Sequence, residues 1–146
     1  MKSFTILEPK SESEYNDYYR IRYDILRKPW NQPENSTKDD TESLSVHILV
    51  KDETGKSVAS GRLQFNSDSE AQIRSMAVIA DFQGNGIGSL IIKHLEKIAT
   101  ERNIKTIILD ARENAVAFYI RNNYRVVEPS YTLFGMIKHF KMLKNL

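Results

Sequence analysis

The segment with the clearest chemical meaning is glycine-rich and reads Gln83-Gly84-Asn85-Gly86-Ile87-Gly88-Ser89. It stands between a predicted strand and a predicted helix, where glycines let backbone amides approach a ligand and the helix N-terminus carries partial positive charge. This arrangement favours phosphate binding; the alternative is a turn that binds nothing. No Gly-Lys-Ser/Thr follows, which argues against a Walker loop, and the order G-x-G-x-G weakens a dinucleotide site of the G-x-G-x-x-G kind.

Two further segments accompany this glycine segment. Ile73-Arg74-Ser75-Met76-Ala77-Val78 precedes it by four residues, and Asn114-Ala115-Val116-Ala117-Phe118-Tyr119 follows later. Gln83, Gly86 and Gly88 match the signature Gln/Arg-x-x-Gly-x-Gly/Ala. In this order the three segments resemble the GNAT superfamily of N-acetyltransferases, and the resemblance extends more loosely over residues 44–142.

The resemblance implies acetyl-CoA as the cofactor. Its pyrophosphate would lie on the amides of the glycine segment, and its pantetheine arm would pair like an added strand with the backbone near Met76 and Val78. Asn114 matches a position that contacts the cofactor in the family, and it is also a candidate helix N-cap. The implied cofactor-binding residues are Met76, Ala77, Val78, Gln83, Gly84, Asn85, Gly86, Ile87, Gly88, Ser89 and Asn114.

The chain contains no cysteine, so an acyl-cysteine intermediate is excluded, which agrees with the direct transfer to an amine in a ternary complex that the resemblance implies. The resemblance assigns the backbone amide of Val78 to the tetrahedral oxyanion and the hydroxyl of Tyr119 to protonation of the leaving thiolate. A tyrosine, with an unperturbed pKa of about 10, is protonated at neutral pH and suits this role. The alternative for Tyr119 is an aromatic side chain that only packs.

The general base is left open. Histone-type members of the family use a glutamate on the strand before the glycine segment, but the matching residue here is Gln72, which cannot accept a proton. Glu70, Glu113 and His139 remain as candidates, directly or through water. A weakly basic amine would need little help.

Residues expected near the acceptor come from several segments. Arg22 falls near the centre of the apolar stripe of the first helix. A charge there indicates either a structural role, as an ion pair or a snorkelling guanidinium, or a contact with a substrate or cofactor anion. Gln72 and Arg74 project from the same face of one strand, which suits a polar or carboxylate-bearing acceptor. The full set of candidate acceptor residues is Arg22, Trp30, Gln72, Arg74 and His139.

The elements that must position these groups alternate in type. Ser11 and Glu14 form a predicted capping box for a helix that Pro29 ends. Residues 30–40 lack any period and are expected to form a loop or frayed helix, a candidate lid. Strands are expected at 4–6, 44–51, 57–65, 72–78, 106–109, 124–127 and 136–143, and further helices at 86–103 and 114–121.

This order predicts an α+β fold, and the resemblance implies the acyl-CoA N-acyltransferase (GNAT) fold, a central mixed, mostly antiparallel sheet flanked by helices. Residues 1–146 are expected to form a single domain. Hydrophobic residues make up 40% and charged residues 27% of the chain, which excludes disordered, collagen-like and membrane-spanning classes.

Composition also bears on partners. The net charge of +2 predicts neither a nucleic-acid nor a membrane partner. No export signal is visible, so a cytoplasmic location is expected. His47, His94 and His139 lack the spacing of a metal site, and no metal is predicted. The expected acceptor is a small-molecule or peptide amine, and the resemblance makes a homodimer an expectation as well. The alternative function is a non-catalytic acyl-CoA sensor or interaction module on the same fold.

Overall fold

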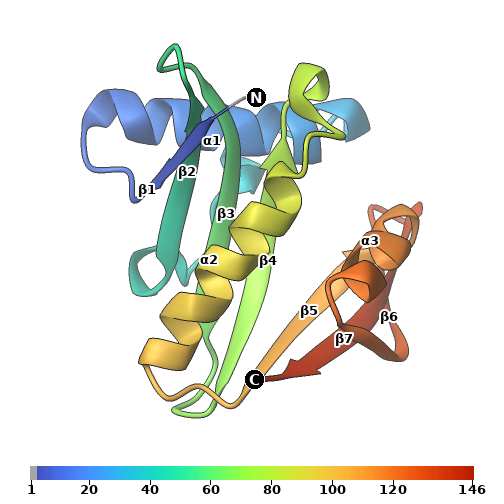
Figure 1. Ribbon diagram of the computed structural model, residues 1–146. Coiled ribbons are helices and arrows are strands. Elements are labelled where there is room, and N and C mark those ends of the chain that lie inside the picture. The colour runs from blue at the N-terminus through green and yellow to red at the C-terminus, as the bar shows by residue number, and fades with distance from the viewer. Residues whose placement is uncertain (1–2) are drawn as a thin grey trace.

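The computed structural model describes residues 3–146, which form one seven-stranded sheet in the order β1-β2-β3-β4-β5-β7-β6 (Figure 1). Only β4 and β5 run parallel; every other neighbouring pair is antiparallel. This confirms the predicted α+β class with a mixed, mostly antiparallel sheet. The strands are β1 Phe4–Leu7, β2 Val46–Asp52, β3 Ser57–Phe65, β4 Glu70–Val78, β5 Thr106–Arg112, β6 Arg125–Leu133 and β7 Ile137–Asn145.

Within residues 3–146, three α-helices flank the sheet: α1 Glu12–Leu26, α2 Ile87–Glu101 and α3 Val116–Arg121. Helices α1 and α2 cover opposite faces of β2–β4 (Figure 1). The alternation along β2 supplies both faces, because Ile48 and Val50 join the core under α2 while Leu49 packs with Tyr18 and Ile21 of α1. Over residues 3–146, none of the helices is both long enough and apolar enough to cross a membrane.

The start of α1 follows the predicted capping box. Ser11 Oγ accepts a hydrogen bond from the Glu14 backbone amide at 3.1 Å, and Glu14 Oε1 accepts one from the Ser11 amide at 3.3 Å. Both amides would otherwise lack partners at a helix N-terminus. The capping box is therefore confirmed by the structure.

The segment expected to be a loop or frayed helix contains two short 3₁₀ helices, Lys28–Trp30 and Glu34–Thr37, and a third follows at Glu42–Leu44. Two buried guanidiniums hold it against the sheet. Arg22 of α1 donates to the Thr37 carbonyl and pairs with Glu42 at 2.7 Å, and Arg62 of β3 pairs with Asp39 at 2.7 Å. These ion pairs fix the segment instead of leaving it an unattached lid.

The last third of the chain departs from the predicted boundaries. A 3₁₀ turn, Glu113–Ala115, precedes α3, whose N-cap is Ala115 without a side-chain hydrogen bond, so Asn114 does not cap this helix. Strand β6 continues past the predicted residue 127 to Leu133, through Pro129, with register shifts on either side of the proline. Because β6 is an edge strand, a proline that lacks an amide donor is tolerated there.

The feature that shapes the centre of the molecule is a bulge in β4. The pairing of β3 with β4 skips from Arg62↔Arg74 to Ser60↔Ala77, so β4 contains one extra residue, and Ser75 adopts φ +53°. A non-glycine residue in this left-handed region is strained by about 1–3 kcal/mol, and such strain is common at functional sites. The parallel pairing with β5 ends at Gln72↔Ile108, below the bulge, and beyond it the two strands diverge (Figure 1).

The extra residue also reverses which face of the sheet successive side chains occupy. Before the bulge, Ala71 and Ile73 belong to the core under α2. After it, Ala77 packs on the α1 side, while Met76 and Val78 pack against the α2 side. The bulge therefore sends Gln72 and Arg74 to one side of β4 and Met76 and Val78 to the other.

Candidate active site

The glycine segment lines one of two adjoining cavities, which we call the donor cavity. Its volume is about 650 Å³, and it lies between the end of β4, the start of α2 and helix α3. Gly84 and Gly86 have φ of +82° and +78°, and a Cβ built on either would meet no protein atom within 4 Å. Glycine is needed at both positions because of the backbone conformation, and the space beside each is open to a ligand.

The start of α2 presents unused backbone donors to this cavity. Gly86 is the N-cap and offers no side chain, and the first helical hydrogen bond joins the Leu90 amide to the Gly86 carbonyl. Within residues 3–146, the amides of Ile87, Gly88 and Ser89 have no hydrogen-bond acceptor. Three free amides at the positive end of a helix form an anion site suited to phosphate.

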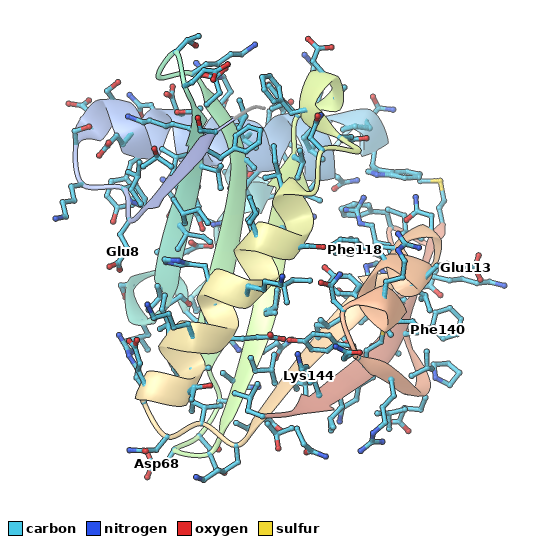
Figure 2. The ribbon with its side chains drawn as sticks, viewed as in Figure 1. Glu8, Asp68, Glu113, Phe118, Phe140 and Lys144 are labelled. Carbon is cyan, nitrogen blue, oxygen red and sulfur yellow. The ribbon has the colours of Figure 1, made fainter. Side chains whose placement is uncertain are left out.

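Close packing fixes where this helix starts relative to α3. A Cβ built on Gly88 would lie 2.8 Å from Phe118 Cζ, closer than real Cβ contacts allow. Phe118 thus lies between α2 and α3 (Figure 2), and it also lines the donor cavity. A side chain at position 88 would therefore displace the Phe118 ring, whereas glycine at positions 84 and 86 is favoured by the backbone angles.

Val78 ends β4 with its backbone turned toward the donor cavity. The Ile79 amide donates to the Val58 carbonyl at 3.0 Å, so in an antiparallel ladder the preceding residue, Val78, directs its own N–H and C=O away from β3. Strand β5 does not pair with that edge of β4, because the two strands have already diverged. The Val78 carbonyl accepts a 2.9 Å hydrogen bond from the Gln83 side-chain amide, which links the signature glutamine to the strand end.

Tyr119 projects from α3 to the other side of the same opening. Its hydroxyl donates to Met76 Sδ at 3.7 Å, a weak acceptor, and its ring packs edge-on against Phe118 and Tyr124. Burial raises the pKa of Tyr119 to about 12. The phenol is therefore fully protonated at neutral pH and can donate a proton.

A second cavity of about 490 Å³, the acceptor cavity, lies on the other side of β4. Gln72, Arg74 and His139 line it, so the structure brings together three of the five residues predicted near the acceptor. Its walls come from β4, β5, the β6–β7 hairpin and the end of α1. The two cavities adjoin, because they share five lining residues: Leu26, Met76, Arg112, Ala115 and Tyr119.

His139 is the only one of the three base candidates that lines either cavity. Its Nδ1 lies 2.9 Å from the Ile137 carbonyl, so Nδ1 carries the proton in the neutral ring and Nε2 keeps the lone pair. Burial lowers the pKa of His139 and outweighs the hydrogen bond to Ile137, which raises it; the nearby Arg112 guanidinium also lowers it, so the ring is mostly neutral at pH 7. Glu70 lines neither cavity, and Glu113 is exposed and points outward (Figure 2).

Three other predicted residues lie apart from the cavities or have a different role. Arg22 is 1% exposed and forms the ion pair with Glu42, the structural alternative of the two considered for it. Trp30 ends a 3₁₀ helix and lines neither cavity. Asn85 is in the glycine segment but turns its side chain to the Phe82 carbonyl at 3.0 Å instead of the cavity. Asn114 does line the donor cavity.

The structure also adds residues that sequence reasoning missed. Arg27, Asp110, Tyr131 and Leu133 line the acceptor cavity, Phe118 and Arg121 line the donor cavity, and Arg112 lines both. The β5 pair Asp110 and Arg112 was detectable as charges two residues apart at the end of a short apolar strand. No comparable signal marks Arg27. Among the residues described, no group of three or more metal-ligating side chains comes together.

Comparison with known proteins gives a consistent result. The sequence pattern of the acetyltransferase (GNAT) family matches residues 13–124. YjcF of Bacillus subtilis, described as an uncharacterized N-acetyltransferase, is 32% identical over 136 residues, which are 93% of this chain and 96% of that protein.

Solved structures share the fold at low sequence identity. An aminoglycoside 6'-N-acetyltransferase complexed with coenzyme A superimposes with a TM-score of 0.81 at 15% identity, covering 97% of this chain and 96% of the other. A GNAT family acetyltransferase from Elizabethkingia anophelis with acetyl-CoA bound gives 0.74 at 18% identity, covering 98% of both.

Proposed function

The chain belongs to the GNAT family of acetyltransferases, and from this premise we propose that it transfers an acetyl group from acetyl-CoA to a primary amine in a single ternary complex. One observation supports this most strongly. The donor and acceptor cavities share Tyr119, whose hydroxyl is protonated and donates to Met76, a residue that also lines both. The chain offers no cysteine for a two-step route, which also favours direct transfer.

The donor cavity fits coenzyme A by the chemistry of its walls. The free amides of Ile87, Gly88 and Ser89 would hold the pyrophosphate, and Arg121 adds a cation on the same cavity. The unpaired edge of β4 after the bulge would take the amide-bearing arm as an added strand. When bound, the cofactor supplies an acetyl group activated as a thioester.

The residues around the junction would then act on the reacting atoms. The Val78 amide donates to the carbonyl oxygen as it gains negative charge, at a backbone position that needs no rearrangement. As the new C–N bond forms and the C–S bond breaks, the Tyr119 hydroxyl gives its proton to sulfur. Neutral His139 takes the proton released from the amine, directly or through water, and solvent restores both groups.

Two measurements test the proposal. Calorimetry with acetyl-CoA and, separately, ATP should show binding of acetyl-CoA alone, and release of free thiol should depend on an added primary amine. Binding without amine-dependent thiol release would favour the sensor alternative, and absence of acetyl-CoA binding would overturn the proposal.

A further inference from the structure

The acceptor cavity contains an excess of positive charge. Arg27, Arg74 and Arg112 line it, Arg112 lining the donor cavity as well, and Asp110 is the one carboxylate among its lining residues. Asp110 already accepts hydrogen bonds from Ser130 Oγ at 2.7 Å and Gln72 Nε2 at 3.4 Å. One carboxylate thus faces three guanidiniums in a half-enclosed space.

Two of these guanidiniums bond only to neutral groups of the protein. Arg27 donates to the carbonyls of Ser36 at 3.2 Å and Leu26 at 3.3 Å, and Arg112 donates to the same Leu26 carbonyl at 3.1 Å. Across residues 3–146, neither forms an ion pair. Arg74, by contrast, lies 3.5 Å from Asp39.

Two other buried arginines of the fold are, in contrast, paired with carboxylates. Arg22 and Arg62 are almost fully buried, and each has a carboxylate oxygen at 2.7 Å. Burial lowers the pKa of Arg27 and of Arg112, and the Arg27 charge acts further on Arg112. Two half-buried guanidiniums whose charges repel each other thus lie beside a cavity, where an anion from outside can reach them.

We infer that the acceptor is a primary amine that also bears a carboxylate, bound by the guanidiniums of Arg27 and Arg112 with its amine directed toward Tyr119. This inference rests on the proposed function and names the substrate class for the same site. A planar guanidinium binds a carboxylate through two parallel hydrogen bonds, which fixes the orientation of a small molecule as well as its charge. The volume of about 490 Å³ is within the range of small-molecule sites.

Matched amines test this directly. Thiol release with acetyl-CoA should be compared for 4-aminobutyrate and butylamine, and for lysine and 1,5-diaminopentane, since each pair differs by a carboxylate. We expect kcat/KM to be roughly 10- to 100-fold higher for the carboxylate member of each pair. 3-Aminopropylphosphonate distinguishes a carboxylate site from a general anion site, and it should be the poorer substrate.

Variants connect the preference to the arginines. Arg27→Gln should abolish the preference, while Arg27→Lys should keep part of it because the charge remains. Arg20→Gln is the matched control, since Arg20 is exposed, pairs with Asp17 and lines neither cavity. Unchanged acetyl-CoA affinity in calorimetry shows that each variant is folded.

The outcomes separate this inference from the proposed function. Equal kcat/KM within both pairs, a preference that survives Arg27→Gln, or a better rate with the phosphonate would overturn the inference while acetyl transfer stands. Absence of turnover with every amine would count against the proposed function. In that case thermal shifts with coenzyme A present decide: stabilisation by 4-aminobutyrate but not butylamine, lost in Arg27→Gln, supports the carboxylate site, and equal shifts overturn it.

Discussion

The Tyr119 hydroxyl lies 3.7 Å from Met76 Sδ, across the opening between α3 and the bulged part of β4. A thioether is a poor acceptor, so this phenol keeps its proton and most of its hydrogen-bonding capacity. The contact therefore positions the hydroxyl while leaving its proton available for a stronger acceptor. It leaves Tyr119 ready for a better acceptor, such as a departing thiolate.

Replacement of Tyr119 by Phe should reduce kcat by about 10²-fold or more, because the leaving group loses its proton donor. Acetyl-CoA affinity measured by calorimetry should stay near that of the wild type. Tyr124→Phe is the matched control, since the Tyr124 hydroxyl bonds to Glu96 at 2.8 Å outside both cavities. It should lose about 1 kcal/mol of stability and keep its kcat. Equal turnover in Tyr119→Phe would remove this residue from the mechanism.

The pH dependence of kcat/KM should test whether His139 is the general base. Because burial lowers its pKa, kcat/KM should fall only as pH drops below its ordinary value of 6.5, where the ring gains a proton and can no longer accept one. His139→Gln should lower the plateau and remove this acidic limb. An identical acidic limb in the variant would assign the base elsewhere. Tyr119, whose pKa is about 12, should contribute no loss of activity between pH 7 and 10.

Alanine substitutions at two glycines with similar backbone angles should distinguish the cost of backbone strain from a loss of ligand binding. Gly86 in the donor cavity has φ +78°, and Gly55 in the β2–β3 turn has φ +88°, with open space around both. Alanine at either should cost about 1–2 kcal/mol of unfolding free energy, measured in urea. Only Gly86→Ala should also weaken acetyl-CoA binding, by roughly tenfold or more. Equal affinities would show that coenzyme A does not approach this backbone.

Removal of the Glu42 carboxylate should strongly lower the free energy of unfolding. It pairs with Arg22 at 2.7 Å and Arg62 at 3.2 Å, so Glu42→Gln leaves buried cations short of a partner and should cost about 3–5 kcal/mol. Arg20→Gln, which breaks an exposed pair, should cost under about 1 kcal/mol. Urea titrations of both variants measure the difference, and similar costs would refute the structural role given to Glu42.

The Arg22–Glu42 ion pair should also make the free energy of unfolding depend on pH in the acid range. Burial opposes ionisation of Glu42, but the hydrogen bond and charge of Arg22 outweigh it and lower its pKa below the ordinary 4.5. The stabilisation is therefore fully present above about pH 4.5 and is lost as pH falls through the lower native value. The stability gap between wild type and Glu42→Gln should narrow accordingly below pH 4.5.

The sequence predicted well what depends on local spacing. The Ser11–Glu14 cap, strand β3 at Ser57–Phe65 and the glycine segment at the start of α2 were all correctly placed. It could not predict the bulge at Ser75, because a serine in the left-handed region is stabilised only by its neighbours in the sheet. Arg27 was missed for a similar reason, since it meets Arg112 only when α1 and β5 pack together. Arg112 itself was detectable as one of two charges at the end of β5.

The bulge in β4 separates two kinds of demand on one strand. Before it, side chains line the acceptor cavity; after it, the strand borders the donor cavity. Under the proposed function, we expect changes at Gln72 or Arg74 to alter which amine is accepted while the backbone proposed to bind the thioester stays the same. A scaffold of this kind is suited to directed evolution of acceptor choice, because diversity can be introduced on one side of a strand with little cost to chemistry on the other.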